Sequence, residues 1–251
     1  MDLQLTGRTA LVTGASVGIG RGIARALAAE GVRLAVTARR IDKLRELSSE
    51  IVAAGGAQPV CIEQDMLADD AAARVAQAAA AGLGQVDILV NNAGGSRSFK
   101  ELHVGEAAWA EAITLNFHRP RQLGDALVDA MIARRWGRIV NITGKSEPEH
   151  VNGAFCAKAA LHSWAKGLSR MVGKHGITVN CVPPGRIHSE QILRNYTPEY
   201  RQWQAEHEIP MGRYGEPEDI ADLVCFLASP RAGYISGAVI PVDGGLRRYQ
   251  F

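Results

Sequence analysis

The chain has 251 residues, of which 47% are hydrophobic and 22% are charged, values typical of a single globular domain. Its formal net charge of +2 is too small to favour binding to nucleic acid or to an anionic membrane. No apolar run approaches the roughly 20 residues that cross a bilayer, and the first residues lack the pattern of a secretory signal. The four cysteines are too widely separated for a zinc site or a disulfide framework. We therefore expect a cytoplasmic protein whose ligands are small molecules.

Strand-like and helix-like segments alternate along the chain. Short apolar runs of strand character occur at 10–12, 34–37, 59–62, 86–90, 138–142 and 178–182. Helical periodicity occurs at 19–27, 42–54, 68–81, 106–134 and 154–174. This alternation predicts one α/β domain over residues 1–251, a doubly wound parallel sheet of about seven strands with helices on both faces. In such a sheet, ligands bind at the carboxyl ends of the strands.

Residues 187–213 depart from this alternation and contain Tyr196, Tyr200 and Trp203. A long excursion within a compact domain is usually a lid or a binding loop. We predict short helices that cover a substrate, with an ordinary surface excursion as the alternative. The histidines within or beside the helical segments, His103, His118, His162 and His175, are predicted to be packing or surface residues.

The turn after the first predicted strand is rich in glycine and leads directly into a helix. A strand, a glycine turn and a helix N-terminus leave free backbone N–H groups and the positive end of the helix dipole at one point. Pyrophosphate suits such a point, although the glycine spacing is wider than in the common G-x-G-x-x-G pattern. The predicted cofactor-binding residues of this turn are Gly14, Ser16, Val17, Gly18, Ile19 and Gly20.

Two arginines stand where a site for an unphosphorylated ribose would carry a carboxylate. The second predicted strand ends in Thr37-Ala38-Arg39-Arg40. An Asp or Glu at this point would bind the ribose 2′-hydroxyl group, whereas a guanidinium group pairs with a 2′-phosphate. Arg39 and Arg40 therefore favour NADP(H) over NAD(H) as the cofactor. The alternative is that they form the solvated start of the next helix.

Several motifs together resemble the short-chain dehydrogenase/reductase family over nearly the whole chain. They are the glycine turn at 13–20, Asp65, the run Asn91-Asn92-Ala93-Gly94, Asn116, and the segments 180–187 and 237–245. The resemblance implies a Rossmann-type fold, a nicotinamide dinucleotide cofactor and oxidoreductase activity. It also implies a homo-oligomer, either a tetramer or a dimer, packed through the helices of 106–134 and 154–174.

The same resemblance implies a role for each motif residue in holding the cofactor. Asp65 and the adjacent Met66 would lie at the adenine, and Ser189 would lie near the phosphates. The residues implied on the ribose side are Asn92, Ala93 and Gly94, and those implied at the nicotinamide are Pro184, Gly185 and Ile187. Lys158 would bond to the hydroxyl groups of the nicotinamide ribose.

The chain departs from the family at the catalytic positions. Family members use a Ser, a Tyr and a Lys four residues after the Tyr, assisted by an Asn, and the phenol protonates the alkoxide that hydride transfer produces. Asn116 and Lys158 match this pattern. Ala154, however, occupies the position of the Tyr, and Thr143 or Gly144 occupies that of the Ser. Because loss of a general acid costs about 10²–10⁴ in rate, the chain needs a different acid/base set.

The segment after the fifth predicted strand offers replacement groups. Lys145 or Ser146 could polarise a carbonyl group or stabilise an oxyanion, and His150 could donate a proton. Tyr196 or Tyr200 of the segment 187–213 could supply a phenol. The candidate catalytic residues are Asn116, Lys158, Lys145 and Ser146.

Three functions are compatible with these residues. The first is an NADP-dependent oxidoreductase with a non-standard acid/base set that acts on a small carbonyl, hydroxyl or conjugated enoyl substrate. One form of it resembles the 2,4-dienoyl-CoA reductases, in which an enolate needs oxyanion stabilisation more than a strong local acid. The second is a lyase or isomerase on the same fold, and the third is a non-catalytic NADP-binding subunit. No metal site is predicted.

Overall fold

The computed structural model describes residues 1–95, 103–144 and 151–248. Six parallel strands form one sheet in the order β3-β2-β1-β4-β5-β6. They are β1 (Thr9–Thr13), β2 (Arg33–Ala38), β3 (Val60–Glu63), β4 (Ile88–Asn91), β5 (Gly137–Ile142) and β6 (Ile177–Val182). Because helices cover both faces of the sheet, β1, β4, β5 and β6 are buried along their whole length. The predicted doubly wound α/β fold is confirmed.

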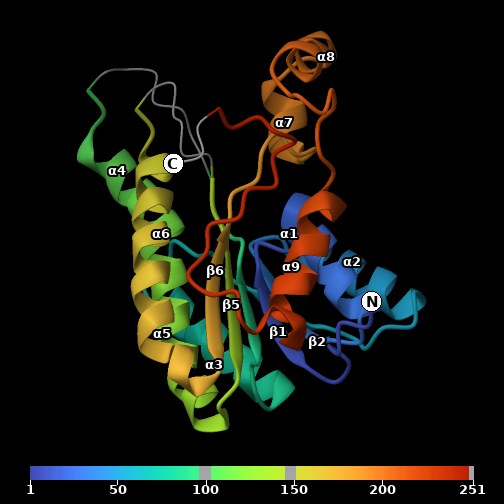
Figure 1. Ribbon diagram of the computed structural model, residues 1–251, viewed down its shortest axis with the longest axis vertical. Helices are drawn as coiled ribbons and strands as arrows, with labels where there is room; N and C mark the ends of the chain where they lie inside the picture. Colours follow the sequence, from blue (N-terminus) through green and yellow to red (C-terminus); the bar gives the residue numbers. More distant parts are fainter. Residues whose placement is uncertain (96–102, 145–150, 249–251) are drawn as a thin grey trace.

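Two layers of helices enclose the sheet (Figure 1). One layer consists of α1 (Gly18–Ala29), α2 (Ile41–Ala53) and α9 (Pro217–Ala228), and the other of α3 (Ala71–Leu83), α5 (Arg119–Arg134) and α6 (Gly153–Val172). The short 3₁₀ turns are η2 (Gly173–His175) and η3 (Pro230–Ala232). No helix in the described ranges combines the length and the apolar character that a bilayer span requires.

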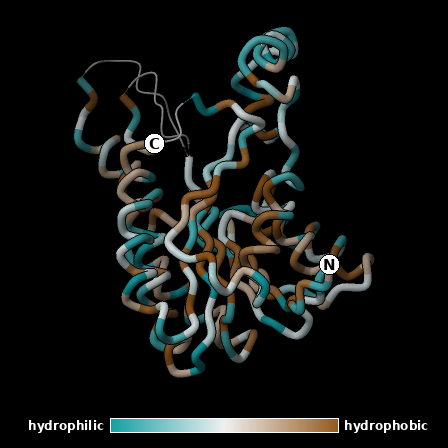
Figure 2. The backbone as a smooth tube through the Cα atoms, viewed as in Figure 1, coloured by the Kyte–Doolittle hydropathy of each residue, from teal (hydrophilic) through white to brown (hydrophobic). Residues whose placement is uncertain are grey.

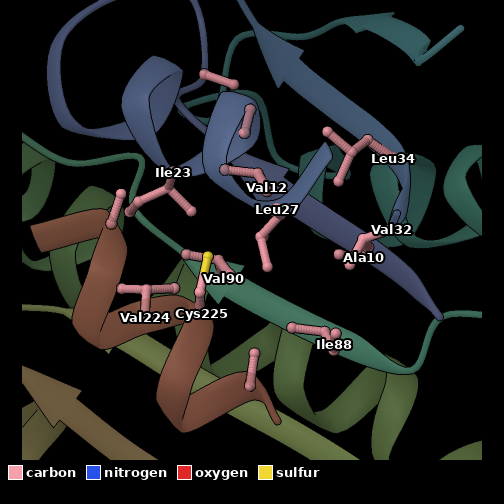
Figure 3. Close-up of a cluster of buried hydrophobic side chains, with 14 of the residues drawn as sticks. Ala10, Val12, Ile23, Leu27, Val32, Leu34, Ile88, Val90, Val224 and Cys225 are labelled. Atoms are coloured by element: carbon pink, nitrogen blue, oxygen red, sulfur yellow. The ribbon is translucent and has the colours of Figure 1, made fainter. Parts of the chain in front are cut away.

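Two apolar clusters hold these layers on the sheet. Figure 3 shows the first, in which Val12 of β1, Ile23 and Leu27 of α1, and Val224 and Cys225 of α9 face one another. The second lies on the opposite face, between the sheet and α3, α5 and α6. Figure 2 shows that the most hydrophobic parts of the chain follow the strands and the helix faces that contact them. Burial on both faces therefore fixes the strand ends, and these carry the candidate site.

Within the described residues the sheet has six strands rather than about seven. The segment 237–245 runs beside β6 but forms only isolated bridges, Val239 to Cys181 of β6 and Val242 to Pro184 just beyond it. Pro183 stands between Cys181 and Gly185, whose N–H groups donate to this segment, and it lacks the N–H group that a continuous ladder requires. The expected seventh strand is therefore reduced to single bridges.

The helix predicted over 106–134 is interrupted by one wider turn. It begins as α4 (Glu106–Ile113), passes through the π-helical turn η1 (Thr114–His118) and continues as α5. Such π turns occur often at functional sites. This one contains Asn116, a predicted site residue.

Two short helices occupy most of the segment 187–213, as predicted. They are α7 (Glu190–Asn195) and α8 (Pro198–His207). Each begins at a hydroxyl cap, because Ser189 Oγ and Thr197 Oγ1 accept backbone N–H groups of the first turn at 3.3 Å. In Figure 1 both helices stand beyond the end of the sheet, above α1 and α9.

Candidate active site

The turn between β1 and α1 forms one wall of the site. Gly14 and Gly18 have φ angles of +67° and +57°, which glycine adopts without strain. A Cβ atom on Gly20 would collide with the Gly14 carbonyl oxygen and the Asn92 amide, so this glycine lets α1 approach the turn closely. The residue before α1 is Val17, whose side chain cannot cap a helix. The first N–H groups of α1 are thus left without a side-chain cap, as phosphate binding requires.

The turn after β4 is fastened to the same wall. Thr13 Oγ1 accepts hydrogen bonds from the backbone N–H groups of Asn92 at 3.0 Å and Ala93 at 2.9 Å. The Asn92 side chain donates to the carbonyl oxygens of Thr13 at 3.0 Å and Gly14 at 3.1 Å. A Cβ atom on Gly14 would lie 2.9 Å from Ala93 Cα, so the two turns touch through their backbones. The structure therefore brings predicted residues of both turns together, while Ser16 is buried and Ile19 is half-buried.

The ends of β2 and β3 carry the residues predicted to bind adenosine. Arg39 and Arg40 follow β2 directly, and both are exposed. Asp65 is exposed after β3, and its Oδ1 accepts the backbone N–H of Leu67 at 3.0 Å. Met66 beside it is buried. Both strand ends lie on the carboxyl side of the sheet, next to the glycine turn, which is where the sequence predicts them.

Arg119 of α5 holds the loop after β3, and sequence reasoning missed it. The residue is buried; its Nε donates to the Met66 carbonyl oxygen at 2.7 Å and its Nη2 to that of Ala68 at 2.9 Å. An arginine in a helical pattern is ordinarily exposed, so the sequence contains no signal that distinguishes this one. Arg119 is a positioning residue for the loop that carries Asp65.

The segment 184–189 follows β6 and is called the strap below. The backbone N–H of Gly185 donates to the Val242 carbonyl oxygen at 2.9 Å, and Pro184 is bridged to Val242. A Cβ atom on Gly185 would lie 2.6 Å from Asp243 Cα, which explains why glycine stands at this close approach. Ile187 is buried at the base of the segment 187–213. The three residues predicted at the nicotinamide therefore lie on one ordered strap.

The start of α7 contacts the glycine turn after β1 and the end of β2. A Cβ atom on Gly18 would lie 3.4 Å from Ser189 Cβ, so Ser189 lies beside the glycine turn, as predicted for a residue near phosphates. Arg40 Nη2 pairs with Glu190 Oε2 at 2.9 Å. An exposed ion pair of this kind contributes about 0–1 kcal/mol. It nevertheless gives Arg40 a carboxylate partner that the sequence did not reveal.

Lys158 of α6 lies beside the turns that follow β4 and β5. Its Nζ donates to the Thr143 carbonyl oxygen at 2.9 Å. Burial of the ammonium group lowers the pKa of Lys158 to about 8, although part of the side chain remains accessible. Cβ atoms on Gly144 and Gly94 would lie 3.1 Å and 3.8 Å from its side chain, so both glycines make room for it. A lysine with this pKa can donate or accept a proton near neutral pH.

Asn116 lies next to Lys158 and acts on the loop after β4. Its Oδ1 accepts the backbone N–H of Gly95 at 3.2 Å, and its Nδ2 donates to the carbonyl oxygens of Gly95 at 3.0 Å and Ala112 at 2.9 Å. A Cβ atom on Gly94 would lie 2.9 Å from Asn116 Oδ1. Backbone groups therefore occupy the Asn116 amide, which makes it a positioning residue beside Lys158.

Ala154, Lys158 and His162 follow one another at four-residue intervals and share one face of α6. Ala154 is only 3% exposed and brings no titratable group. His162 Nε2 lies 2.8 Å from Thr143 Oγ1. Burial, together with the charges of Arg247 and Lys158, lowers the pKa of His162. The prediction of a packing or surface histidine missed this contact, because it depends on where the end of β5 meets α6.

Three candidate residues, Lys145, Ser146 and His150, lie outside the described residues. The two tyrosines suggested as phenol donors differ in environment. The Tyr196 hydroxyl accepts a hydrogen bond from Arg186 Nη1 at 3.2 Å, whereas Tyr200 is 43% exposed and stacks on Trp203. Tyr196 is therefore the one in contact with the strap after β6.

These features together suit a nicotinamide dinucleotide. An uncapped helix N-terminus suits the phosphates, two backbone turns meet beside it, and a desolvated ammonium group lies next to the turns after β4 and β5. The fold and these features define a dinucleotide-binding protein of the α/β oxidoreductase class.

Comparison with known proteins identifies the family. Residues 14–247 match the family described as "Enoyl-(Acyl carrier protein) reductase". The 3-oxoacyl-[acyl-carrier-protein] reductase FabG of Pseudomonas aeruginosa is 35% identical over 247 residues, which cover 97% of this chain and 99% of the relative. The galactitol 2-dehydrogenase (L-tagatose-forming) of Cereibacter sphaeroides is 37% identical, with 96% of each chain covered. The L-sorbose reductase of Gluconobacter frateurii, solved with NADPH and L-sorbose, has a TM-score of 0.93 at 29% identity, with 99% of this chain and 100% of that chain covered. The chain belongs to the short-chain dehydrogenase/reductase family of NAD(P)-dependent oxidoreductases.

Proposed function

We propose that the protein is an NADP(H)-dependent oxidoreductase that acts on a small carbonyl, hydroxyl or conjugated enoyl substrate with a non-standard acid/base set. The observation that carries this proposal is the Lys158 ammonium group, enclosed beside Thr143 with its pKa at about 8. NADP(H), when bound, supplies or accepts the hydride. The names of the relatives describe an acyl-carrier-protein reductase, a polyol dehydrogenase and a ketose reductase, which supports a small oxygen-bearing substrate.

In this proposal Lys158 takes over the role of the absent phenol. The oxygen of a reduced carbonyl or enoyl group gains negative charge as hydride arrives, and an enclosed ammonium group stabilises that charge strongly. One N–H of Lys158 is held by the Thr143 carbonyl oxygen, so the others remain for a ribose hydroxyl group and for the substrate oxygen. Ala154, one helical turn away on the same face, leaves this approach free of a larger side chain. Lys145 and Ser146 are proposed as additional donors to the oxyanion.

The remaining roles follow the same scheme. We propose that the turn after β1 and Ser189 hold the phosphates and that the turn after β4 lies along the ribose. The loop of Asp65 and Met66 contacts the adenine, and Pro184, Gly185 and Ile187 hold the nicotinamide. The helices α7 and α8 are proposed to cover the substrate. A cytoplasmic homo-oligomer, a tetramer or a dimer packed through α4, α5 and α6, completes the proposal.

Titration of the protein with NADPH and NADH tests the cofactor assignment. We expect at least roughly tenfold tighter binding of NADPH, because two guanidinium groups stand at the end of β2 and no carboxylate does. Isothermal calorimetry or quenching of tryptophan fluorescence measures both dissociation constants. No binding, or tighter binding of NADH, would refute the assignment.

A panel of ketones, aldehydes, polyols and enoyl thioesters then tests the reaction. Turnover with a change at the nicotinamide absorbance band supports an oxidoreductase. Conversion without that change identifies a lyase or isomerase, and tight NADPH binding without any conversion identifies a non-catalytic subunit. The Ala154→Tyr variant sharpens the result: a fall in turnover of the protein's own substrate shows that Ala154 makes room for it.

Glu190→Gln tests whether Arg40 binds the 2′-phosphate. The carboxylate of Glu190 competes for the Arg40 guanidinium group, so its removal is expected to lower the dissociation constant of NADPH by up to about fivefold, in line with the free energy of an exposed ion pair. NADH binding should not change. Glu46→Gln, which breaks the comparable exposed pair with Lys43, is the matched control. An equal change in the dissociation constants of NADPH and NADH would contradict this, because it would show that Glu190 affects binding only by supporting the start of α7.

A further inference from the structure

The strap between the sheet and α7 directs Arg186 toward the helices α7 and α8. Residues 186–188 are extended and pair with Gly215, whose N–H donates to the Arg186 carbonyl oxygen and whose carbonyl oxygen accepts the N–H of His188, each at 2.8 Å. Side chains alternate along an extended segment. Because Ile187 is buried in the core, Arg186 and His188 project to the other side. There Arg186 meets Tyr196, and the ring of His188 lies 5.2 Å from that of Tyr214.

Only some of the hydrogen-bond donors of the Arg186 guanidinium group have partners. Its Nη1 donates to the Tyr196 hydroxyl at 3.2 Å, and its Cζ lies 5.4 Å from the centroid of that ring. Its Nε is buried and has no hydrogen-bond partner among the described residues. A buried donor without a partner is costly, and it is the kind of group that a bound ligand satisfies.

Nearby acidic side chains are engaged elsewhere. Asp243 accepts the backbone N–H groups of Gly245 at 3.0 Å and Arg247 at 3.2 Å, and Asp219 pairs with Arg213 at 2.8 Å. In the described part of the chain, no ion pair includes Arg186. The Arg186 charge is therefore left without a carboxylate partner there.

A cavity opens beside this group. It has a volume of about 160 Å³. Its lining includes Arg186, Ile187 and Met211, together with Arg213 and the two engaged acidic residues Asp219 and Asp243. Ile187 is also the residue proposed to contact the nicotinamide. The Arg186 side chain thus lies one residue from the proposed reacting end, beneath the helices proposed to cover the substrate.

We propose that the Arg186 guanidinium group binds a carboxylate of the substrate, so that the substrates are small oxo or hydroxy acids. The guanidinium fork matches a carboxylate, and the Nε side of the fork is the side left free. The Tyr196 hydroxyl accepts from Nη1, on the other side of the fork, and so holds the guanidinium group in place. This inference rests on the proposed function and deepens it by naming the substrate class.

Matched pairs of small oxo acids and their methyl esters, titrated into the NADPH-loaded protein by calorimetry, test the inference. The acid is expected to bind roughly 10- to 100-fold more tightly than its ester, the effect of a hydrogen bond to a charged group. Arg186→Gln should remove that preference and leave ester binding unchanged, and Arg186→Lys should restore part of it. Arg194→Gln, which removes an exposed arginine on α7, should bind as the wild type does.

The outcomes separate this inference from the proposed function. Acids that bind no better than esters overturn the carboxylate site even when NADPH binds and turnover is observed. Equal weakening of acid and ester in Arg186→Gln also overturns it, because it indicates only structural support for α7 and α8. Failure of NADPH to bind contradicts the proposed function instead. The acid preference is then measured on the cofactor-free protein, where its absence overturns the carboxylate site as well.

Discussion

Replacing Lys158 by methionine is expected to abolish turnover and at the same time to stabilise the cofactor-free protein. The rate should fall by about 10²–10⁴, the usual effect of losing a general acid. Burial lowers the pKa of this lysine from 10.5 to about 8, which corresponds to about 3 kcal/mol of destabilisation while the group is charged. Loss of the hydrogen bond to the Thr143 carbonyl oxygen offsets about 1 kcal/mol of that gain. The free energy of unfolding at pH 7 should therefore rise by about 2 kcal/mol, as measured by urea denaturation.

The pH dependence of this difference has a definite sign. Between pH 8 and 10.5 the unfolded chain still binds a proton that folded wild-type Lys158 has lost, so the stability of the wild type rises with pH relative to the variant. The advantage of Lys158→Met is thus complete below pH 8 and is lost toward pH 10.5. Lys166→Met, an exposed lysine on the same helix, is the control and should change stability by no more than about 0.5 kcal/mol. A wild type that is more stable than Lys158→Met at pH 7 would contradict the assignment of a desolvated ammonium group.

Replacing Gly20 by alanine is expected to remove most of the cofactor affinity. The new methyl group would collide with the Gly14 carbonyl oxygen and with the Asn92 amide, and neither can move without disturbing a turn. Overpacking of this kind costs roughly 1–3 kcal/mol. Because Asn92 joins the two glycine turns, the strain falls on the proposed phosphate site, and the dissociation constant of NADPH should rise roughly 10- to 100-fold.

Gly167→Ala is the matched control for this substitution. Gly167 lies in α6, is exposed, and has open space where the methyl group would be placed. Alanine is the better helix former, so stability should rise by up to about 1 kcal/mol while NADPH binding stays unchanged. Wild-type affinity in Gly20→Ala, measured by calorimetry beside this control, would show that α1 does not need the close approach.

The sequence predicts the strands and glycine turns of the site better than the contacts of its charged side chains. Apolar runs locate the strands because burial on both sides of a parallel sheet leaves a continuous signal, and Gly14 and Gly18 are recognisable because their backbone angles favour glycine. The seventh strand was wrong because pairing at the edge of the sheet depends on N–H groups that the prolines beside β6 lack.

The residues that sequence reasoning missed are charged or titratable side chains whose burial is decided by tertiary structure. Arg119, Arg186 and His162 look like surface residues in their local patterns, yet each meets a strand end, a loop or a strap from a distant part of the chain. The pKa of Lys158 belongs to the same class, because burial of its ammonium group lowers it. Local periodicity carries no information about such contacts.

The π turn η1 and the start of α5 together hold two loops at the end of the sheet. Asn116 in this turn fixes the loop beside Lys158, and Arg119, three residues later, fixes the loop that carries Asp65. A single piece of helix thus sets the distance between the loop beside Lys158 and the loop that carries Asp65. A slip or rotation of that piece would displace both loops together, so their spacing is kept even when α7 and α8 move.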